Sequence, residues 1–242
     1  MSGVVCTLWP REGAAPAAGV ETTLGPEESR HLVKVRRVRT GEEVWAAVGD
    51  GRGVRCVVIS DERDAAGLRA EEVVTGWREP VRRVALALGM VRPQHMETAL
   101  TEGTALGLHR FIPLFTERVE HRRHRPDRWD RLAAEAVKQC GRGWVPPVEA
   151  PLALETLIES RGERERLLVA DAGAPSGLRD VLSREGVAAS REILLVVGPE
   201  GDLSPRERDL LQGAGGIPFH LGPRRLRSET ASLAALAVLL AG

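Results

Sequence analysis

The chain has 242 residues, of which 43% are hydrophobic, and its 34 basic and 34 acidic side chains leave no formal net charge. It is long enough for one large or two small domains, and no apolar run approaches the ~20 residues that span a bilayer. Its start has no basic region followed by a hydrophobic one, and its 3 cysteines lack metal-ligand spacing. We therefore expect a cytoplasmic protein without a signal peptide, a membrane segment or a metal.

The first 78 residues predict a small β domain. Residues 1–20 are rich in Ala, Gly and Pro and indicate a loose arm, and residues 27–39 predict a helix. Apolar residues alternate on both sides of Asp50-Gly51, which predicts a β-hairpin, and residues 68–75 predict another strand. Short strands without parallel crossovers favour a small barrel. We place the domain boundary between residues 78 and 79.

The predicted helix over residues 27–39 carries a basic cluster. Arg30, Lys34, Arg36, Arg37 and Arg39 follow one another with no acidic residue between them. A charge run is most often a solvated helix face, but basic residues at this density also bind the phosphates of nucleic acids. The sequence leaves these two interpretations about equal.

From residue 79 onward, strand and helix patterns alternate, which predicts a parallel sheet with helices over 79–242. The five apolar residues from Ile193 to Val197 are typical of a strand buried on both faces. Ser204-Pro205-Arg206-Glu207 predicts a capped helix start, and Ser228 is a candidate N-cap of a very apolar last helix. Further strands are predicted at residues 84–89, 111–114, 167–170 and 217–221, and helices at 94–106 and 126–140.

Two loops stand at the carboxyl ends of predicted strands, where open α/β sheets bind ligands. The first is Gly198-Pro199-Glu200-Gly201, and the second runs from Leu221 to Arg227 and contains Arg224 and Arg225. A Gly-Pro-x-Gly turn alone is usually a tight connection, and arginines in a loop can serve solubility. Together, the two loops favour a small-molecule site.

These loops also resemble a known signature. Gly-Pro-Glu-Gly followed by Leu-Gly-Pro-Arg-x-Leu-Arg-Ser-Glu-Thr-Ala is similar to the C-terminal motif of the ribosomal RNA small subunit methyltransferase E family, within the SPOUT superfamily. Residues 31–37 with Thr40-Gly41-Glu42, and residues 135–142, resemble two further family motifs. The resemblance implies an N-terminal PUA-like, RNA-binding β-barrel over 1–78 and a C-terminal α/β parallel sheet with a trefoil knot over 79–242.

The resemblance implies methylation of N3 of a uridine in the 16S rRNA of the small ribosomal subunit, with S-adenosylmethionine (SAM) as cofactor. Arg227 could stabilise the developing uracil anion, and Glu229 could act as base or orient Arg227. A purely structural Arg227–Glu229 salt bridge is the alternative. The implied cofactor contacts are Val197, Gly198, Glu200, Gly201, Leu221, Gly222, Leu226 and Thr230.

RNA contacts are expected from the basic cluster at residues 30–39 and from Arg142, which could equally complement the dipole of the preceding helix. The last helix is apolar around most of its circumference, more than one intrachain contact needs. Because SPOUT enzymes pair through this region, we also expect a homodimer.

Three departures from the family pattern leave other functions open. Cys140 replaces the usual Ser, Glu102 to Gly107 replaces Lys-x-Thr-Glu-Leu-Gly, and Gly201-Asp202-Leu203 replaces Gly-Gly-Phe. We do not interpret Cys140 as a nucleophile. A non-catalytic RNA-binding or ribosome-assembly factor that kept the fold is one alternative. A metabolic α/β enzyme that binds a nucleotide through residues 198–201 is another, and it leaves the basic cluster unexplained.

Overall fold

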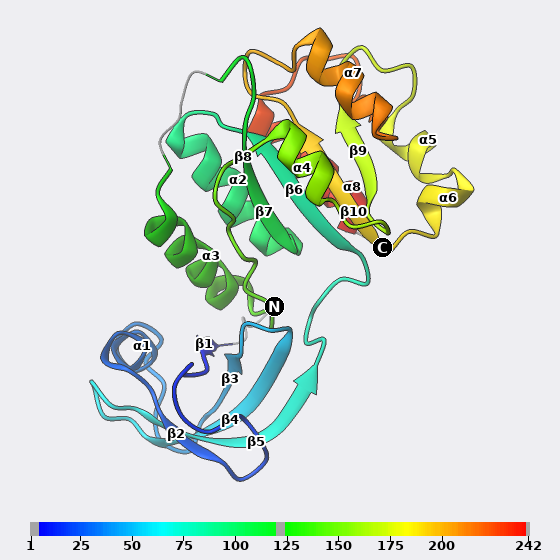
Figure 1. Ribbon diagram of the computed structural model, residues 1–242. Coiled ribbons are helices and arrows are strands. Elements are labelled where there is room, and N and C mark those ends of the chain that lie inside the picture. The colour runs from blue at the N-terminus through cyan, green and yellow to red at the C-terminus, as the bar shows by residue number, and fades with distance from the viewer. Residues whose placement is uncertain (1–4, 120–123, 241–242) are drawn as a thin grey trace. The chain divides into compact units, whose positions relative to one another are not determined.

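The computed structural model describes residues 5–119 and 124–240 (Figure 1). Backbone packing divides them into two compact units. The N-terminal unit contains residues up to 79 together with residues 134–145, and the C-terminal unit contains the described residues of 80–133 and of 146–242. Residues 134–145 therefore group with the N-terminal unit although they follow the predicted boundary at 78/79.

The N-terminal unit is a curled five-stranded sheet in the order β1-β3-β4-β5-β2. Its first strand pairs in parallel with β3, and the other pairs are antiparallel. Irregular register between β4 and β5 bends the sheet. This curled, mixed sheet confirms the PUA-like class. The strands are β1 (Cys6–Leu8), β2 (Glu21–Thr23), β3 (Glu43–Ala47), β4 (Arg52–Ser60) and β5 (Gly67–Thr75).

The alternating apolar residues on the two sides of Asp50-Gly51 form a β-hairpin with one buried face, as predicted. Val44, Ala46, Val54, Cys56 and Val58 all turn into one core, so the predicted hairpin is confirmed as β3 and β4. The loose arm predicted for residues 1–20 is wrong in part, because β1 lies within it and pairs with the edge of β3. The open edge of a strand offers backbone hydrogen bonds that composition alone does not reveal.

The helix predicted over residues 27–39 ends early. Helix α1 (Pro26–Arg30) continues as the π-helical turn η1 (His31–Val35) and stops there. Leu32 and Val38 both enter the core, and the Val38 amide donates to the Leu32 carbonyl at 3.2 Å. Closing this turn puts Arg37 at a φ of 58°, which no helix accommodates. Arg36, Arg37 and Arg39 therefore lie in a loop rather than on a helix face.

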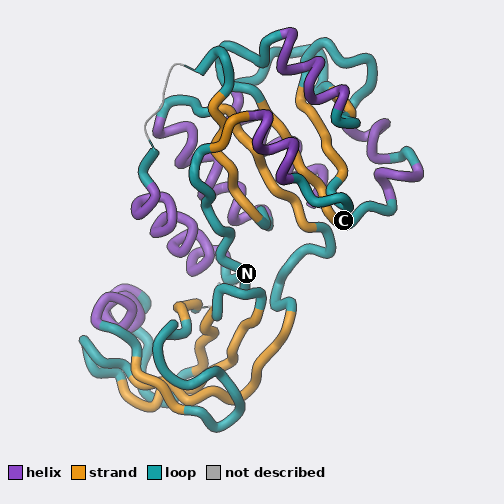
Figure 2. Tube along the Cα trace, in the orientation of Figure 1, coloured by secondary structure: helices purple, strands orange, loops and turns teal. Residues whose placement is uncertain are grey.

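The C-terminal unit is a six-stranded sheet in the order β11-β9-β10-β6-β7-β8, and all its pairs are parallel. Its strands lie between helices (Figure 2). The parallel α/β class is thereby confirmed. Every residue from Ile193 to Val197 in the inner strand β10 is buried. The trefoil knot that the resemblance implies stays a prediction. The strands are β6 (Arg83–Gly89), β7 (Arg110–Phe115), β8 (Leu152–Ala153), β9 (Arg166–Ala170), β10 (Glu192–Val197) and β11 (Ile217–Phe219).

Helices cover both faces of this sheet (Figure 1). Leu194 and Val196 pack in one core with residues of α4 and around α7, while α8 packs against α2 and the strands β6 and β10 on the other face. Ser204 caps α7 with a capping box, as predicted. No pattern predicted β8, α4, α5 or α6. The helices are α2 (Pro93–Leu106), α3 (Pro126–Cys140), α4 (Leu154–Ser160), α5 (Leu178–Leu182), α6 (Glu185–Ala188), α7 (Pro205–Gly213) and α8 (Ser228–Leu240).

Within the described residues, no helix has the length and apolar character needed to cross a membrane. The same residues contain no group of three or more His, Cys, Asp and Glu side chains placed to hold a metal ion.

Candidate active site

A cavity of about 450 Å³ opens at the carboxyl edge of the parallel sheet. Strands β9, β10 and β11 all end there, as expected for a ligand site of an α/β sheet. The loops after β10 and β11, singled out from the sequence, meet in this cavity. Its walls are residues 170–172, 197–200, 202, 219–222, 224–228 and 231.

Most residues expected to contact the cofactor line this cavity. Gly201 and Thr230 do not: Gly201 is exposed beside Arg118, and Thr230 is exposed on α8. The lining residues among those expected are Val197, Gly198, Glu200, Leu221, Gly222 and Leu226.

Two glycines shape the loops around the cavity. A Cβ atom on Gly89, at the end of β6, would lie 2.5 Å from the Pro199 ring, so the loop after β10 can approach only a glycine. Gly222 has a φ of 106°, in the region that favours glycine, and a Cβ there would meet no atom within 4 Å. No described atom therefore covers the Gly222 backbone on the side where a side chain would project.

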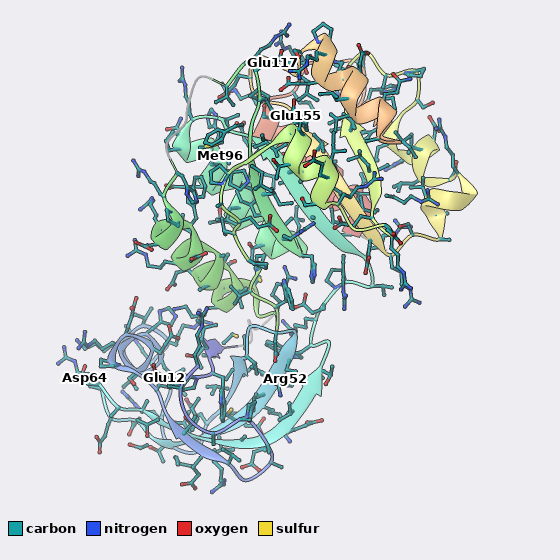
Figure 3. The ribbon with its side chains drawn as sticks, viewed as in Figure 1. Glu12, Arg52, Asp64, Met96, Glu117 and Glu155 are labelled. Atoms are coloured by element: carbon teal, nitrogen blue, oxygen red, sulfur yellow. The ribbon has the colours of Figure 1, made fainter. Side chains whose placement is uncertain are left out.

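Three arginines line the cavity, and a fourth contacts the loop after β10. The three are Arg224, Arg225 and Arg227, all exposed, and the fourth, Arg118, donates to the Gly201 carbonyl at 3.1 Å. None of the four forms an ion pair with a described acidic residue. Arg206 on α7, in contrast, is bound to Glu117 and Glu155, which are both labelled in Figure 3. The mouth therefore presents unneutralised positive charge, which suits an anionic ligand.

Glu229 lies in the first turn of α8 and is only 8% exposed. The salt bridge with Arg227 considered from the sequence is absent from the described contacts. Glu229 Oε2 lies instead 3.7 Å from His95 Nδ1, on α2. Glu200 Oε1 lies 3.6 Å from the same nitrogen. No sequence pattern indicated a role for His95. The available signal for a site residue was its position two residues after Pro93, shortly after the end of a strand.

Some residues of the basic cluster at residues 30–39 are paired with acidic side chains, and others have no such partner among the described residues. Arg30 pairs with Asp64 at 2.6 Å (Figure 3), and Arg39 lies 3.7 Å from Asp61. The other three cations are exposed and have no ion pair with a described acidic residue. They are Lys34, Arg36 and Arg37.

Residues 135–142, which resemble a family motif, lie mostly inside the N-terminal unit. Arg142 is only 3% exposed, and its guanidinium is bound to the Glu79 carboxylate. Lys138 binds Glu28 at 2.6 Å. Burial raises the pKa of the Cys140 thiol, which disfavours the reactive thiolate. Arg142 is thus buried within the N-terminal unit, where it binds Glu79.

Two family models match the chain: an RNA methyltransferase domain matches residues 78–240, and an RNA methyltransferase PUA domain matches residues 24–69. The Bacillus subtilis ribosomal RNA small subunit methyltransferase E is 30% identical, across 88% of this chain and 87% of that protein. The chain belongs to this methyltransferase E family. A Synechocystis relative of the same name is 31% identical, across 92% of this chain and 74% of that protein.

Solved structures agree with the assignment to the methyltransferase E family. A Neisseria gonorrhoeae ribosomal RNA small subunit methyltransferase E bound to SAM is 26% identical and superposes with a TM-score of 0.87, across 98% of this chain and 96% of that one. A Legionella pneumophila structure that holds the bound cofactor SAM is 27% identical, with a TM-score of 0.81, across 98% and 97% of the two chains.

One departure from the methyltransferase E pattern has a structural explanation. Asp202, where the family usually has glycine, adopts a φ of 64°, a conformation that favours glycine. Its carboxylate accepts the Leu203 amide at 2.8 Å and binds Arg208, whose Nε lies 3.4 Å from Asp171. One guanidinium of α7 thus contacts two carboxylates of the cavity and compensates part of their charge, and it holds Asp202 in this conformation. In the segment Glu102 to Gly107, which also departs from the family pattern, Glu102 and Ala105 are both exposed on α2.

Proposed function

We propose that this protein transfers a methyl group from SAM to N3 of a uridine in the 16S rRNA of the small ribosomal subunit. The observation that carries the proposal is the cavity at the sheet edge, where both signature loops meet and three arginines without described acidic partners line the walls. The buried carboxylate of Glu229 does not itself line the cavity but follows directly after the lining residue Ser228 in the first turn of α8. The names of the relatives and the SAM bound in two related structures support the same reaction.

The cavity suits SAM. Its volume of about 450 Å³ is within the range of small-molecule sites. Val197, Leu221 and Leu226 offer apolar surface to an adenine ring. The Gly222 amide already donates to His220 Nδ1 at 3.1 Å, so the Gly222 carbonyl is the polar backbone group that would face the adenine or ribose. We therefore assign the cofactor to the lining residues of the two loops and leave out Gly201 and Thr230. When bound, SAM supplies an electrophilic methyl group.

The chain's own residues must activate the acceptor. Uridine N3 carries a proton and is a poor nucleophile until that proton leaves. We assign Glu229 as the base: the N3–H bond breaks, its electron pair stays on N3, and the proton passes to the carboxylate. Arg227, exposed at the cavity mouth, stabilises the negative charge that develops on the uracil ring. Holding N3 in line with the methyl group makes the transfer effectively unimolecular.

RNA binding is assigned to cations without acidic partners. Arg118, Arg224 and Arg225 would contact phosphates around the target nucleotide. Lys34, Arg36 and Arg37 would hold RNA on the N-terminal unit. Arg30 and Arg39 contribute less because acidic residues already compensate their charges, and Arg142 is left out because it is buried.

We also propose that the enzyme is a homodimer built on α8. Ala234, Ala237 and Val238 remain only half-buried in the single chain, and Leu106 of the neighbouring helix α2 is 38% exposed. Pairing with a second copy would cover this apolar surface.

The test is methylation of 16S rRNA from cells that lack the protein. With purified protein and SAM, nuclease digestion and mass spectrometry should reveal one new N3-methyluridine at a single position. Methylation of another base or atom would contradict the proposal. Binding of RNA without methyl transfer would favour a non-catalytic ribosome-assembly factor instead.

A further inference from the structure

His95 stands between two carboxylates that come from two other parts of the C-terminal unit. Its Nδ1 lies 3.6 Å from Glu200 Oε1, in the loop after β10, and 3.7 Å from Glu229 Oε2, at the start of α8. The side chains of His95, Glu229 and Glu200 are 16%, 11% and 43% exposed. The group therefore runs from the buried carboxylate of Glu229 to the more exposed carboxylate of Glu200.

Two atoms of this group are buried and have no hydrogen-bond partner among the described residues: His95 Nδ1 and Glu229 Oε2. Buried polar atoms in native proteins are nearly always paired, and leaving them unpaired destabilises the fold. The two atoms face each other at a distance slightly beyond a hydrogen bond. A small movement on substrate binding would join them, and hydrogen bonds in free enzymes often tighten in this way.

The other ring nitrogen indicates where the proton lies. The Gln94 side-chain amide nitrogen lies 3.4 Å from His95 Nε2. An amide nitrogen donates, so this contact matches the tautomer in which Nε2 accepts and the hydrogen is on Nδ1, facing both carboxylates. The next acidic residue of α2, Glu97, is bound by Arg128. Glu200 and Glu229 are therefore the charged groups that the described contacts place against the ring.

We propose that His95 is a positioning residue that acts through Glu229, an inference that rests on the proposed function. The Nδ1 hydrogen would hold the Glu229 side chain in one orientation, directed at the substrate, because a buried polar group needs a hydrogen-bond partner. Through Glu200, the same nitrogen connects the base to the loop that lines the cofactor cavity. His95 itself need not touch the uridine.

The first experiment compares single-turnover methylation by wild type, His95→Ala and His95→Asn. His95→Ala should lower the rate ~10- to 100-fold, less than the ~100- to 10,000-fold typical of losing a general base. The deficit should shrink as pH rises, since ionisation of N3 itself then needs less help. His95→Asn, whose amide nitrogen can replace Nδ1 as donor, should recover much of the rate. Thr98→Ala, an exposed change one turn along α2, is the matched control.

The outcomes separate the inference from the proposed function. If wild type does not methylate uridine N3, the proposed function is wrong. If wild type is active and His95→Ala stays within about twofold of it, the inference is overturned. His95→Ala should add no further loss in a Glu229→Gln background, because the two residues act as a unit. Independent losses that multiply would contradict a role through Glu229.

Two readouts exclude a merely structural role. SAM affinity by calorimetry should be nearly unchanged in His95→Ala, and an equal loss of SAM affinity and rate in both His95 variants would overturn the proposal. In the cofactor-free protein, ¹⁵N NMR of the imidazole should find the proton on Nδ1. A proton on Nε2 would also contradict it.

Discussion

Lys138→Met should unfold the N-terminal unit more easily, because it leaves a buried carboxylate without its cation. Lys138 is only 4% exposed in its side chain and binds Glu28 at 2.6 Å, while Glu28, 20% exposed, also accepts the Thr7 hydroxyl at 2.6 Å. Removing one partner of a buried pair typically lowers the free energy of unfolding by ~3–5 kcal/mol. We expect about 3 kcal/mol, the lower end, because Glu28 keeps Thr7 and some contact with solvent.

A double-mutant cycle measures this pair directly. Glu28→Leu alone leaves Lys138 with Glu135 at 2.7 Å and should cost less than Lys138→Met. The double variant should be more stable than the sum of the two single losses predicts, since replacing both charges by apolar groups is often nearly neutral. Urea unfolding, followed by circular dichroism and tryptophan fluorescence, is the assay. Additive losses, or a Lys138→Met variant as stable as wild type, would refute the reasoning.

The same pair predicts the pH dependence of stability. Burial opposes ionisation of Glu28, but hydrogen bonds from Lys138 and Thr7 outweigh it and hold its pKa below the ordinary value of 4.5. A carboxyl whose pKa is lowered by folding stabilises the protein above its unfolded pKa and loses that contribution as pH falls through the folded one. The stability lost by Lys138→Met should therefore be largest at neutral pH and shrink below about pH 4.5.

The remaining predictions concern catalysis, RNA binding and assembly. Arg227→Ala should lower the single-turnover methylation rate by about 100- to 1000-fold and retain SAM affinity. The residual methylation rate of Glu229→Gln should rise with pH. Near-normal rates in both variants would exclude the two residues from the mechanism. Changing Arg36 and Arg37 to Ala should weaken RNA binding and flatten its salt dependence without altering SAM affinity, whereas unchanged RNA affinity would make the cluster a solvated surface. Asp202→Gly should relieve backbone strain but also release Arg208. Calorimetry should therefore detect a changed SAM affinity, while the free energy of unfolding changes little. A gain in the free energy of unfolding above ~1 kcal/mol would mean that the strain dominates. Sedimentation should find a dimer of the 26.2 kDa chain, and a monomer at micromolar concentration would count against pairing through α8.

Local pattern determined most of the secondary structure and the place of the cavity. Five apolar residues from Ile193 to Val197 can be buried on both faces only as an inner strand, and the capping box at Ser204 satisfies its own backbone groups. Because parallel strands end at one edge of a sheet, the two signature loops had to meet there. Each of these conclusions depends on residues close together in the chain.

Only the tertiary structure decided which charged side chains are free. Arg142 and Glu79 are 63 positions apart, and Lys138 and Glu28 are 110 apart, so no local pattern distinguishes these buried cations from the exposed Arg36 and Arg37. Likewise, the contacts of His95 with Glu200 and Glu229 form only because α2, the loop after β10 and α8 pack together. The physical reason is that a charged residue's role depends on its solvation and its partners. Long-range packing supplies both.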